Sequence, residues 1–140
     1  MNPMIENLAR AVGQSLLANR QKLSCAESCS GGGVGYAITT VPGSSAWFEQ
    51  GFITYSNQAK STMLNIPLSL IDAHGAVSQT TVEAMADGAL AVSGADYALS
   101  LSGIAGPEGG LSLLHLVRCR RTPSCQSHTR PLTPQQTNTH

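Results

Sequence analysis

The stretch AESCSGGGVG, residues 26–35, places a serine and a cysteine directly before a run of glycines. The preceding KLSCAE is short and partly alternating, which predicts a β-strand, and the following VGYAITTV predicts a helix that ends before Pro42. A strand that passes through a tight glycine turn into a helix is the basic unit of a layered α/β fold.

The remainder of residues 1–110 continues this alternation of strands and helices. Apolar residues recur at helical spacing in several segments, and the segments between them are rich in β-branched and aromatic residues. Ser78 is suited to begin the last of the helices and Gly94 to end it. The expected helices are 4–19, 34–41, 57–64, 67–74 and 80–94, with a short turn at 44–48, and the expected strands are 22–27, 51–56 and 96–106.

The glycine run admits two interpretations. Backbone N–H groups at the start of a helix can hold an anion such as phosphate, although the run matches neither a P-loop nor G-x-G-x-x-G. Alternatively, the glycines only let the helix cross closely over the strand. A second glycine-rich loop, SGIAGPEGG at 102–110, follows the last expected strand. Two such loops at strand ends often face one crevice, so a small phosphorylated ligand between them is physically reasonable.

Two candidate nucleophiles stand at the junction of strand and glycine run. Ser28 fits either a helix N-cap or a nucleophile presented from a sharp turn. Cys29 is its rival, although a cysteine after a strand is more often a small buried apolar residue. Both interpretations remain open from the residues alone.

A serine nucleophile needs a base, and histidines are poorly placed to supply one. Of His74, His115, His128 and His140, three lie beyond residue 110. Lys60 is the alternative, because a lysine desolvated near a site can lose its charge and accept a proton. It can equally be a solvated helix residue. Tyr55 and Asn57, in TYSNQAK, either orient such a site or close a strand.

The blocks AESCSGG, PGSSAWFEQGFITYSNQAK, HGAVSQTTVEAMADGAL and ADYALSLSGIAGPEGG resemble the CinA C-terminal domain family over about residues 4–110. That family includes stand-alone nicotinamide mononucleotide deamidases. The resemblance implies a three-layer α/β/α sandwich, without metal or cofactor, acting in pyridine nucleotide salvage. The implied reaction is hydrolysis of the carboxamide of nicotinamide mononucleotide to nicotinate mononucleotide and ammonia, and self-association as a homodimer is implied as well.

The resemblance also implies a set of site residues. Ser28 would attack the amide carbon after Lys60 takes its proton, and Tyr55 completes the catalytic set. Backbone N–H groups near Ser30 and Gly31 are expected to hold the oxyanion. The residues expected to bind substrate are Ser30, Gly31, Gly32, Asn57, Gly103 and Gly106.

Residues 111–140 match nothing in the family. They hold three of the seven prolines with many serines and threonines, which predicts a largely disordered tail after a domain at 1–110; whether 111–117 joins the sheet is left open. Because the family continues with further strands and a closing helix, we expect lost strands, an exposed apolar face and impaired activity. The alternatives are a nucleotide-binding module without turnover and a competence- or DNA-damage-associated protein.

The composition of the chain limits the classes of partner that it is expected to bind. Residues 1–110 carry four Lys/Arg against eight Asp/Glu, a net charge of −4, and the tail carries four arginines and no acid. An acidic domain with an arginine tail that lacks aromatic residues disfavours nucleic-acid binding. No apolar run approaches a membrane span and no secretory signal is visible, so a cytoplasmic protein is expected. The four cysteines are expected to be free thiols, and a zinc site at Cys119, Cys125 and His128 is disfavoured.

Overall fold

The structure, a computed structural model, describes residues 1–104, 111–119, 129–131 and 136–139. Its helices are α1 (Pro3–Ala18), α2 (Gly33–Thr39), a 3₁₀ turn η1 (Ser44–Ala46), α3 (Asn57–Leu64), α4 (Leu68–His74) and α5 (Gln79–Ser93). Its strands are β1 (Leu23–Glu27), β2 (Phe48–Ile53), β3 (Tyr97–Gly103), β4 (Leu111–Cys119), β5 (Thr129–Pro131) and β6 (Gln136–Thr139). The helices expected from the sequence are confirmed, and β2 begins and ends three residues before the expected strand.

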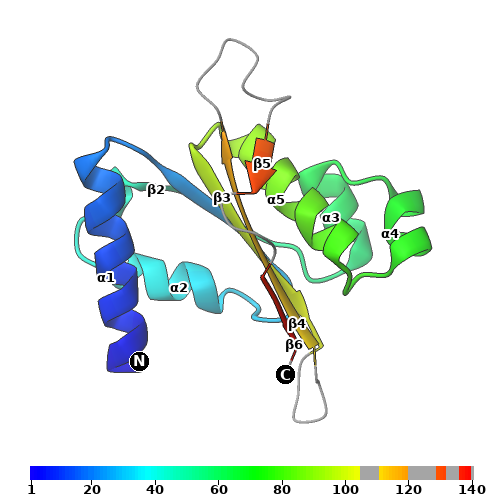
Figure 1. The fold of residues 1–140 in the computed structure, drawn as a ribbon, viewed down its shortest axis with the longest axis horizontal. Coiled ribbons are helices and arrows are strands. Elements are labelled where there is room, and N and C mark those ends of the chain that lie inside the picture. The colour runs from blue at the N-terminus through cyan, green and yellow to red at the C-terminus, as the bar shows by residue number, and fades with distance from the viewer. Residues whose placement is uncertain (105–110, 120–128, 132–135, 140) are drawn as a thin grey trace.

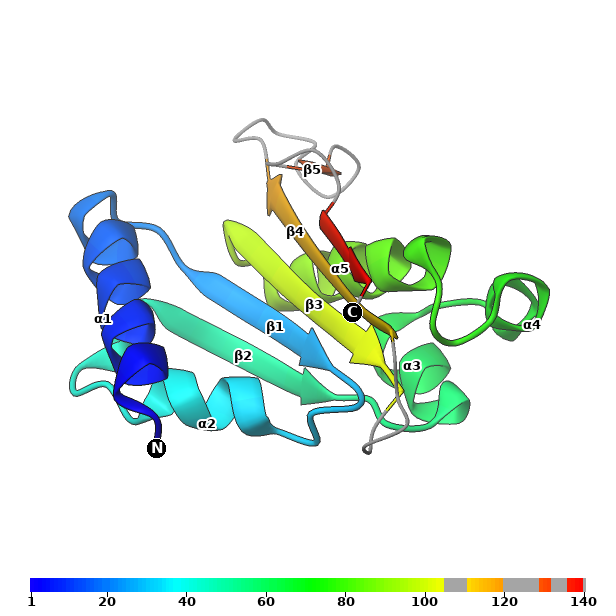
Figure 2. The same cartoon turned by 60° about the horizontal axis from the view of Figure 1, so that its bottom comes forward.

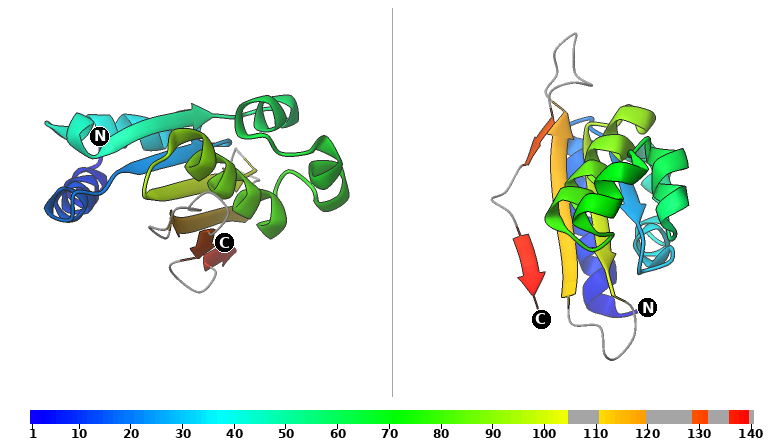
Figure 3. Two further views of the ribbon diagram at one scale, coloured as in Figure 1. Left: turned by 90° about the horizontal axis from the view of Figure 1, so that it is seen from above. Right: turned by 90° about the vertical axis from the view of Figure 1, so that its right-hand side faces the viewer.

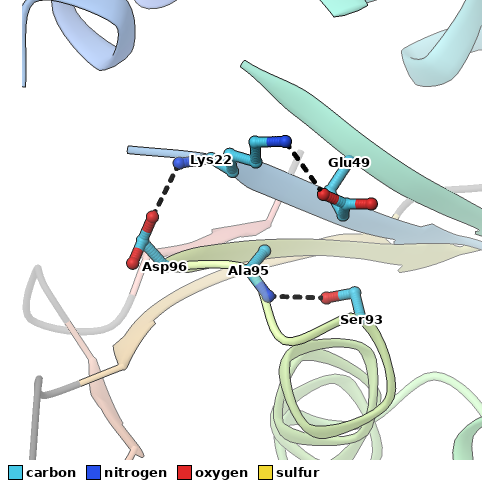
Figure 4. A network of polar contacts seen from close by, with 5 residues as sticks. All are labelled: Lys22, Glu49, Ser93, Ala95 and Asp96. Carbon is cyan, nitrogen blue, oxygen red and sulfur yellow. Dashed lines mark hydrogen bonds and ion pairs between the residues drawn. The ribbon is translucent and has the colours of Figure 1, made fainter. Parts of the chain in front are cut away.

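The strands form one mixed sheet in the order β2-β1-β3-β4-β5, with β6 also paired to β4. β1 runs parallel to β2 and β3, and β4 runs antiparallel to β3. Figure 4 shows how the amino ends of the parallel strands are held: the Lys22 N–H donates to Asp96 at 2.8 Å, and the Lys22 ammonium pairs with Glu49 at 3.2 Å. The three parallel strands therefore begin at the same level, and their carboxyl ends lie together at one end of the sheet.

Helices cover both faces of the sheet, as the resemblance implies. α1 and α2 lie on one side and α3, α4 and α5 on the other (Figure 1). Side chains of β3 alternate between the faces: Ala98, Ser100 and Ser102 are buried, whereas Tyr97, Leu99 and Leu101 are only half-buried. The α/β/α sandwich is therefore present, and β3 buries its side chains more completely on one face of the sheet than on the other.

The larger core lies between α5 and the sheet. Met85, Ala86 and Ala89 of α5 are fully buried there against Ala98 and Val117 of the sheet. The smaller core, on the side of α1 and α2, consists of Leu16, Leu23, Ile38, Val41 and Trp47. Between α1 and the sheet a groove stays open, with a largely apolar pocket of about 430 Å³ beside a second of about 450 Å³.

The segment after residue 110 joins the sheet where the structure describes it. β4 pairs with β3 along its length, from Gly103 opposite Ser112 to Tyr97 opposite Arg118, and β6 lies beside β4 (Figure 3). His115 and Val117 of β4 are buried toward α5, so the strand has an inward face. Residues 111–117 thus form a strand; the rest of the expected disordered tail lies partly outside the described residues, and its separation as a tail stays a prediction.

None of the helices in the described part of the chain has the length and hydropathy required to cross a lipid bilayer.

Candidate active site

The carboxyl ends of β1, β2 and β3 lie side by side at one end of the sheet, beside α3 (Figure 2). A pocket of about 210 Å³ opens there. It is lined by Ser28 and Cys29 after β1, Tyr55, Asn57 and Lys60 at the start of α3, Ala76 and Val77 before α5, and Ser102 and Gly103 at the end of β3. Residues separated by up to 75 positions in the sequence therefore share one small cavity.

Ser28 and Lys60 contact each other at the base of this pocket. The Lys60 Nζ lies 3.2 Å from the Ser28 Oγ, to which it donates, and 3.2 Å from the backbone carbonyl of Tyr55. Both side chains are buried, with 7% of Ser28 and 1% of Lys60 exposed. The sequence-based pairing of serine with lysine is therefore matched by a direct contact between the two side chains.

Lys60 is held by the local structure of α3. The Ser56 hydroxyl begins the helix by accepting from the Ala59 N–H at 3.0 Å, and Lys60 follows on the side that faces the sheet. Burial lowers the pKa of Lys60, while the nearby Cys29 acts in the opposite direction. A buried lysine with a lowered pKa more readily becomes the neutral amine that can accept a proton.

Tyr55 enters the site through its backbone. Its carbonyl accepts from Lys60 and, at 3.5 Å, from the Ser28 hydroxyl. The residue is 67% exposed, and no hydrogen bond to its phenol is found among the described residues. The catalytic role expected for the tyrosine side chain is thus not evident in the ground-state contacts and stays a prediction.

The glycine run folds around a side chain that the sequence analysis overlooked, the carboxylate of Glu27. Its Oε1 accepts from the Ser30 hydroxyl at 2.7 Å and the Gly32 and Val34 N–H groups at 3.2 and 2.9 Å, and its Oε2 accepts from the Gly35 N–H at 2.7 Å. The available signal was an acidic residue at the end of the expected strand, four positions before the first glycine of the run.

These contacts decide between interpretations of the run that the residues alone left open. Ser28 does not cap α2; Gly32 stands at the N-cap position without a side-chain cap, and Glu27 supplies the acceptor instead. The anion held by the glycine N–H groups is the chain's own carboxylate rather than a phosphate. Glu27 reaches these donors because it is the last residue of β1 and is fixed beside the turn.

The other expected substrate-binding residues are distributed as follows. Asn57 and Gly103 line the pocket, whereas Ser30 and Gly32 contact Glu27, and the Gly31 N–H donates to the Ser28 carbonyl at 3.1 Å. Among the described residues, the N–H groups of Cys29 and Ser30 have no hydrogen-bond partner. Gly106 lies outside the described residues.

The cysteine and histidine side chains that the structure describes do not form a second site. Cys25 and Cys29 are free thiols, as predicted, and burial together with the charge of Glu27 raises the pKa of Cys25 to about 12. His74 ends α4, and His115 is buried against Gln79. Within the parts of the chain that the structure describes, no group of three His, Cys, Asp or Glu residues can hold a metal ion. The side chains of Cys119, Cys125 and His128 are not among those described.

A buried lysine beside a serine hydroxyl, in a small pocket at the carboxyl ends of parallel strands, is an arrangement that can activate the serine as a nucleophile. Comparison with known proteins makes this more specific. The model of the CinA C-terminal domain family matches residues 5–113, and the chain belongs to this family.

Similar sequences carry two kinds of name. A putative competence-damage inducible protein of Symbiobacterium thermophilum is 55% identical over 105 residues, 75% of this chain and 25% of that protein. Nicotinamide-nucleotide amidohydrolase PncC of Pseudomonas putida is 53% identical over 110 residues, 79% of this chain and 68% of that protein. For PncC of Escherichia coli K12 the identity is 53% over 103 residues, 74% of this chain and 62% of the relative. The chain thus spans a quarter to about two thirds of these proteins.

Solved structures agree with the fold. The competence damage-inducible protein A (ComA) of Klebsiella pneumoniae superposes with a TM-score of 0.80 at 29% identity, over 96% of this chain and 84% of that one. The competence/damage inducible protein CihA of Agrobacterium tumefaciens gives 0.78 at 37% identity, over 94% and 81% of the two chains. The mixed sheet with helices on both faces is therefore the architecture of CinA-superfamily proteins.

Proposed function

We propose that this chain carries the catalytic pair of an amidohydrolase that deamidates nicotinamide mononucleotide. The observation that carries the proposal is the buried contact of 3.2 Å between Lys60 Nζ and Ser28 Oγ, in a pocket at the carboxyl ends of the parallel strands. The names of the PncC relatives, 53% identical over three quarters of this chain, supply the substrate class. The acidic balance of residues 1–110 disfavours the alternative of direct DNA binding.

The reaction begins with neutral Lys60. As the Ser28 Oγ forms a bond to the carboxamide carbon, the lysine amine takes the hydroxyl proton and becomes an ammonium. The carbonyl oxygen becomes an oxyanion, for which the N–H groups of Cys29 and Ser30, directly after the nucleophile, are the nearest candidates. The Tyr55 carbonyl holds the ammonium by the hydrogen bond already present.

The second half returns the enzyme to its starting state. The C–N bond breaks as the Lys60 ammonium gives its proton to the leaving nitrogen, so ammonia departs and an ester remains on Ser28. Water then attacks this ester while Lys60 again accepts a proton. Cleavage of the ester restores the Ser28 hydroxyl and releases the carboxylate product. Because the base must be uncharged, turnover is expected to rise as the pH passes upward through the lowered pKa of Lys60.

Ammonia release from nicotinamide mononucleotide tests the proposal. We expect Ser28→Ala and Lys60→Met each to lose at least about a hundredfold in kcat, since each removes one partner of the proton transfer. Cys29→Ala is the matched control for loss of a side chain in the same loop, and is expected to keep most of the turnover. Turnover that survives Ser28→Ala while disappearing in Cys29→Ala would assign the nucleophile to the cysteine instead.

A second candidate is a nucleotide-binding module without turnover. It is favoured by the end of the family match at residue 113, after which the sequence does not follow the family model. Calorimetry separates the two, because the module binds the mononucleotide with no ammonia released. Because the family match ends at residue 113, we also propose that turnover is slower than that of the PncC relatives. Analytical ultracentrifugation at matched concentrations tests the homodimer that the resemblance implies.

A further inference from the structure

Glu27 is one of the most completely buried acidic groups in the described structure, with 2% of the residue exposed. Four donors converge on its two carboxylate oxygens: the Ser30 hydroxyl and the N–H groups of Gly32, Val34 and Gly35. No lysine or arginine pairs with it among the described residues. Its charge is therefore balanced by the dipoles of the glycine turn rather than by a cation.

The sequence of the turn is adapted to this carboxylate. Gly31 and Gly32 have φ angles of 60° and 110°, in the region that favours glycine, and this backbone path turns the N–H groups back toward Glu27. A Cβ at residue 35 would stand 3.3 Å from Glu27 Oε2, tighter than most such contacts. The glycines thus permit a close approach between the turn and Glu27.

Glu27 and Ser28 act on opposite faces of the sheet. Side chains alternate along an extended strand, so Glu27 is directed toward α2 and the next residue toward Lys60 of α3. The backbone between them is anchored on both sides: the Glu27 carbonyl accepts from the Thr54 N–H at 2.8 Å, and the Ser28 N–H donates to the Leu101 carbonyl at 3.0 Å. Only the segment after Ser28 lacks a strand partner, and the carboxylate holds that segment.

We propose that Glu27 is a positioning residue for Ser28: its carboxylate holds the turn of residues 30–35 so that the hydroxyl stays at the Lys60 amine. This inference rests on the proposed function for its kinetic consequence. It also implies that the donors on the turn are already taken, so the phosphate of the substrate binds elsewhere in the site.

Glu27→Gln is the first test, because the amide keeps the shape of the side chain but replaces one acceptor oxygen by an NH₂ group. That group faces one or more of the four protein donors and cannot accept their hydrogen bonds. We expect kcat to fall roughly tenfold to a hundredfold, since a nucleophile displaced by a fraction of an ångström reacts slowly, with KM changed less than about threefold. Glu49→Gln, in the exposed pair with Lys22, is the matched control and should retain both constants. Unchanged kcat in Glu27→Gln, or a rise in KM alone, would overturn the proposal.

Chemical rescue is the second test, and it does not require turnover. Glu27→Ala removes the equivalent of one acetate, so acetate should raise its thermal midpoint in a saturable manner and leave the wild type and Glu49→Ala unaffected. If the wild type deamidates the mononucleotide, acetate should also restore kcat in Glu27→Ala. A wild type without turnover would contradict the proposed function, whereas the midpoint would still report on the carboxylate.

Amide hydrogen exchange covers the case in which Glu27→Ala does not fold. In Glu27→Gln we expect the N–H groups of Gly32, Val34 and Gly35 and the backbone of Ser28 to exchange at least tenfold faster than in the wild type, with the strands unchanged. Faster exchange at the three glycine-turn positions but not at Ser28 would show that the carboxylate caps α2 without positioning the nucleophile, and would overturn the proposal.

Discussion

The face of the sheet that carries α3, α4 and α5 buries its side chains more completely than the face that carries α1 and α2. On the first face, Met85 and Ala86 are inaccessible and pack against Ala98 of β3. On the second, Leu99 and Leu116 are half-buried and border an open groove under α1. Lys60 belongs to the closed face, so its contact with Ser28 lies on the more tightly packed of the two described faces.

The comparison teaches which packing the site depends on. A lysine is desolvated only where neighbouring side chains exclude water, and the close packing of α3 on α5 provides this. The groove on the other face includes a largely apolar pocket, and this pocket shares no lining residue with the pocket that holds Ser28 and Lys60. Substitutions on the two faces should therefore differ in how much they lower the free energy of unfolding.

The largest difference is expected for a methionine pair. Met85→Ala leaves a cavity between α5 and the sheet and should lower the free energy of unfolding by about 2–5 kcal/mol. Met4→Ala, on the exposed side of α1, should change it by less than about 0.5 kcal/mol. Urea denaturation followed by circular dichroism measures both. Equal losses would mean that α1 is packed as closely as α5.

Two helical glycines sharpen the comparison. A Cβ at residue 88 would overlap the backbone carbonyl of Leu64, which cannot move without shifting α3 against α5, so Gly88→Ala should cost about 1–3 kcal/mol. A Cβ at residue 13 would instead overlap the indole of Trp47, which borders the open groove. Gly13→Ala should cost less, because the indole can shift whereas the Leu64 backbone cannot; the gain of about 1 kcal/mol in helix propensity is common to both substitutions. Thermal denaturation of both variants measures the two losses of stability. A larger loss for Gly13→Ala than for Gly88→Ala would mean that the groove beside Trp47 is closed.

The pH dependence of stability reports on Lys60 itself. Its folded pKa is lowered below the ordinary 10.5, so between the two values the unfolded chain binds more protons than the native one. The contribution of Lys60 to stability should therefore rise with pH across this window, by at most about 1.4 kcal/mol per pH unit. The raised pKa of Cys25 acts in the opposite direction above about pH 9, so the Lys60 contribution is read as the difference between the wild type and a Lys60 variant. Lys60→Met should lose the rise, and Lys22→Met, at an exposed ion pair, should keep it. Denaturation midpoints between pH 6 and 11 measure the slope.

The smallest effect is expected on the rim of the groove. Leu8 is 65% exposed on α1, and Leu8→Gln should change the free energy of unfolding by less than about 0.5 kcal/mol. The same substitution at Leu64, which is buried beneath α5, should cost several times more. A loss above about 1 kcal/mol for Leu8→Gln, measured by urea denaturation, would indicate that this side chain is covered in solution.

Much of the fold could be predicted from the periodicity of the chain. The helix over Pro3–Ala18 and the caps at Ser78 and Gly94 follow from local side-chain chemistry, which acts over a few residues. The end of β2 was misplaced because Ile53 and Tyr55 are both apolar enough for a strand, while the turn into α3 is decided by Ser56. The strand at Leu111–Cys119 stayed undecided because only its pairing with β3 selects an extended conformation.

The candidate site divides in the same way. Ser28 and Lys60 could be singled out from their motifs, but the role of Glu27 could not, because its four partners become neighbours only after the glycine turn folds back. The tertiary structure likewise showed that Tyr55 contributes a carbonyl and that Ser102 lines the pocket.

Taken by itself, the amino-acid sequence determined the alternation of strands and helices and the chemical types available at the strand ends, since both depend on residues close together in the chain. The tertiary structure decided which of those groups are buried, what holds the glycine turn and which face of the sheet stays open. Burial and charge compensation depend on segments that are distant along the chain, and only packing brings them into contact.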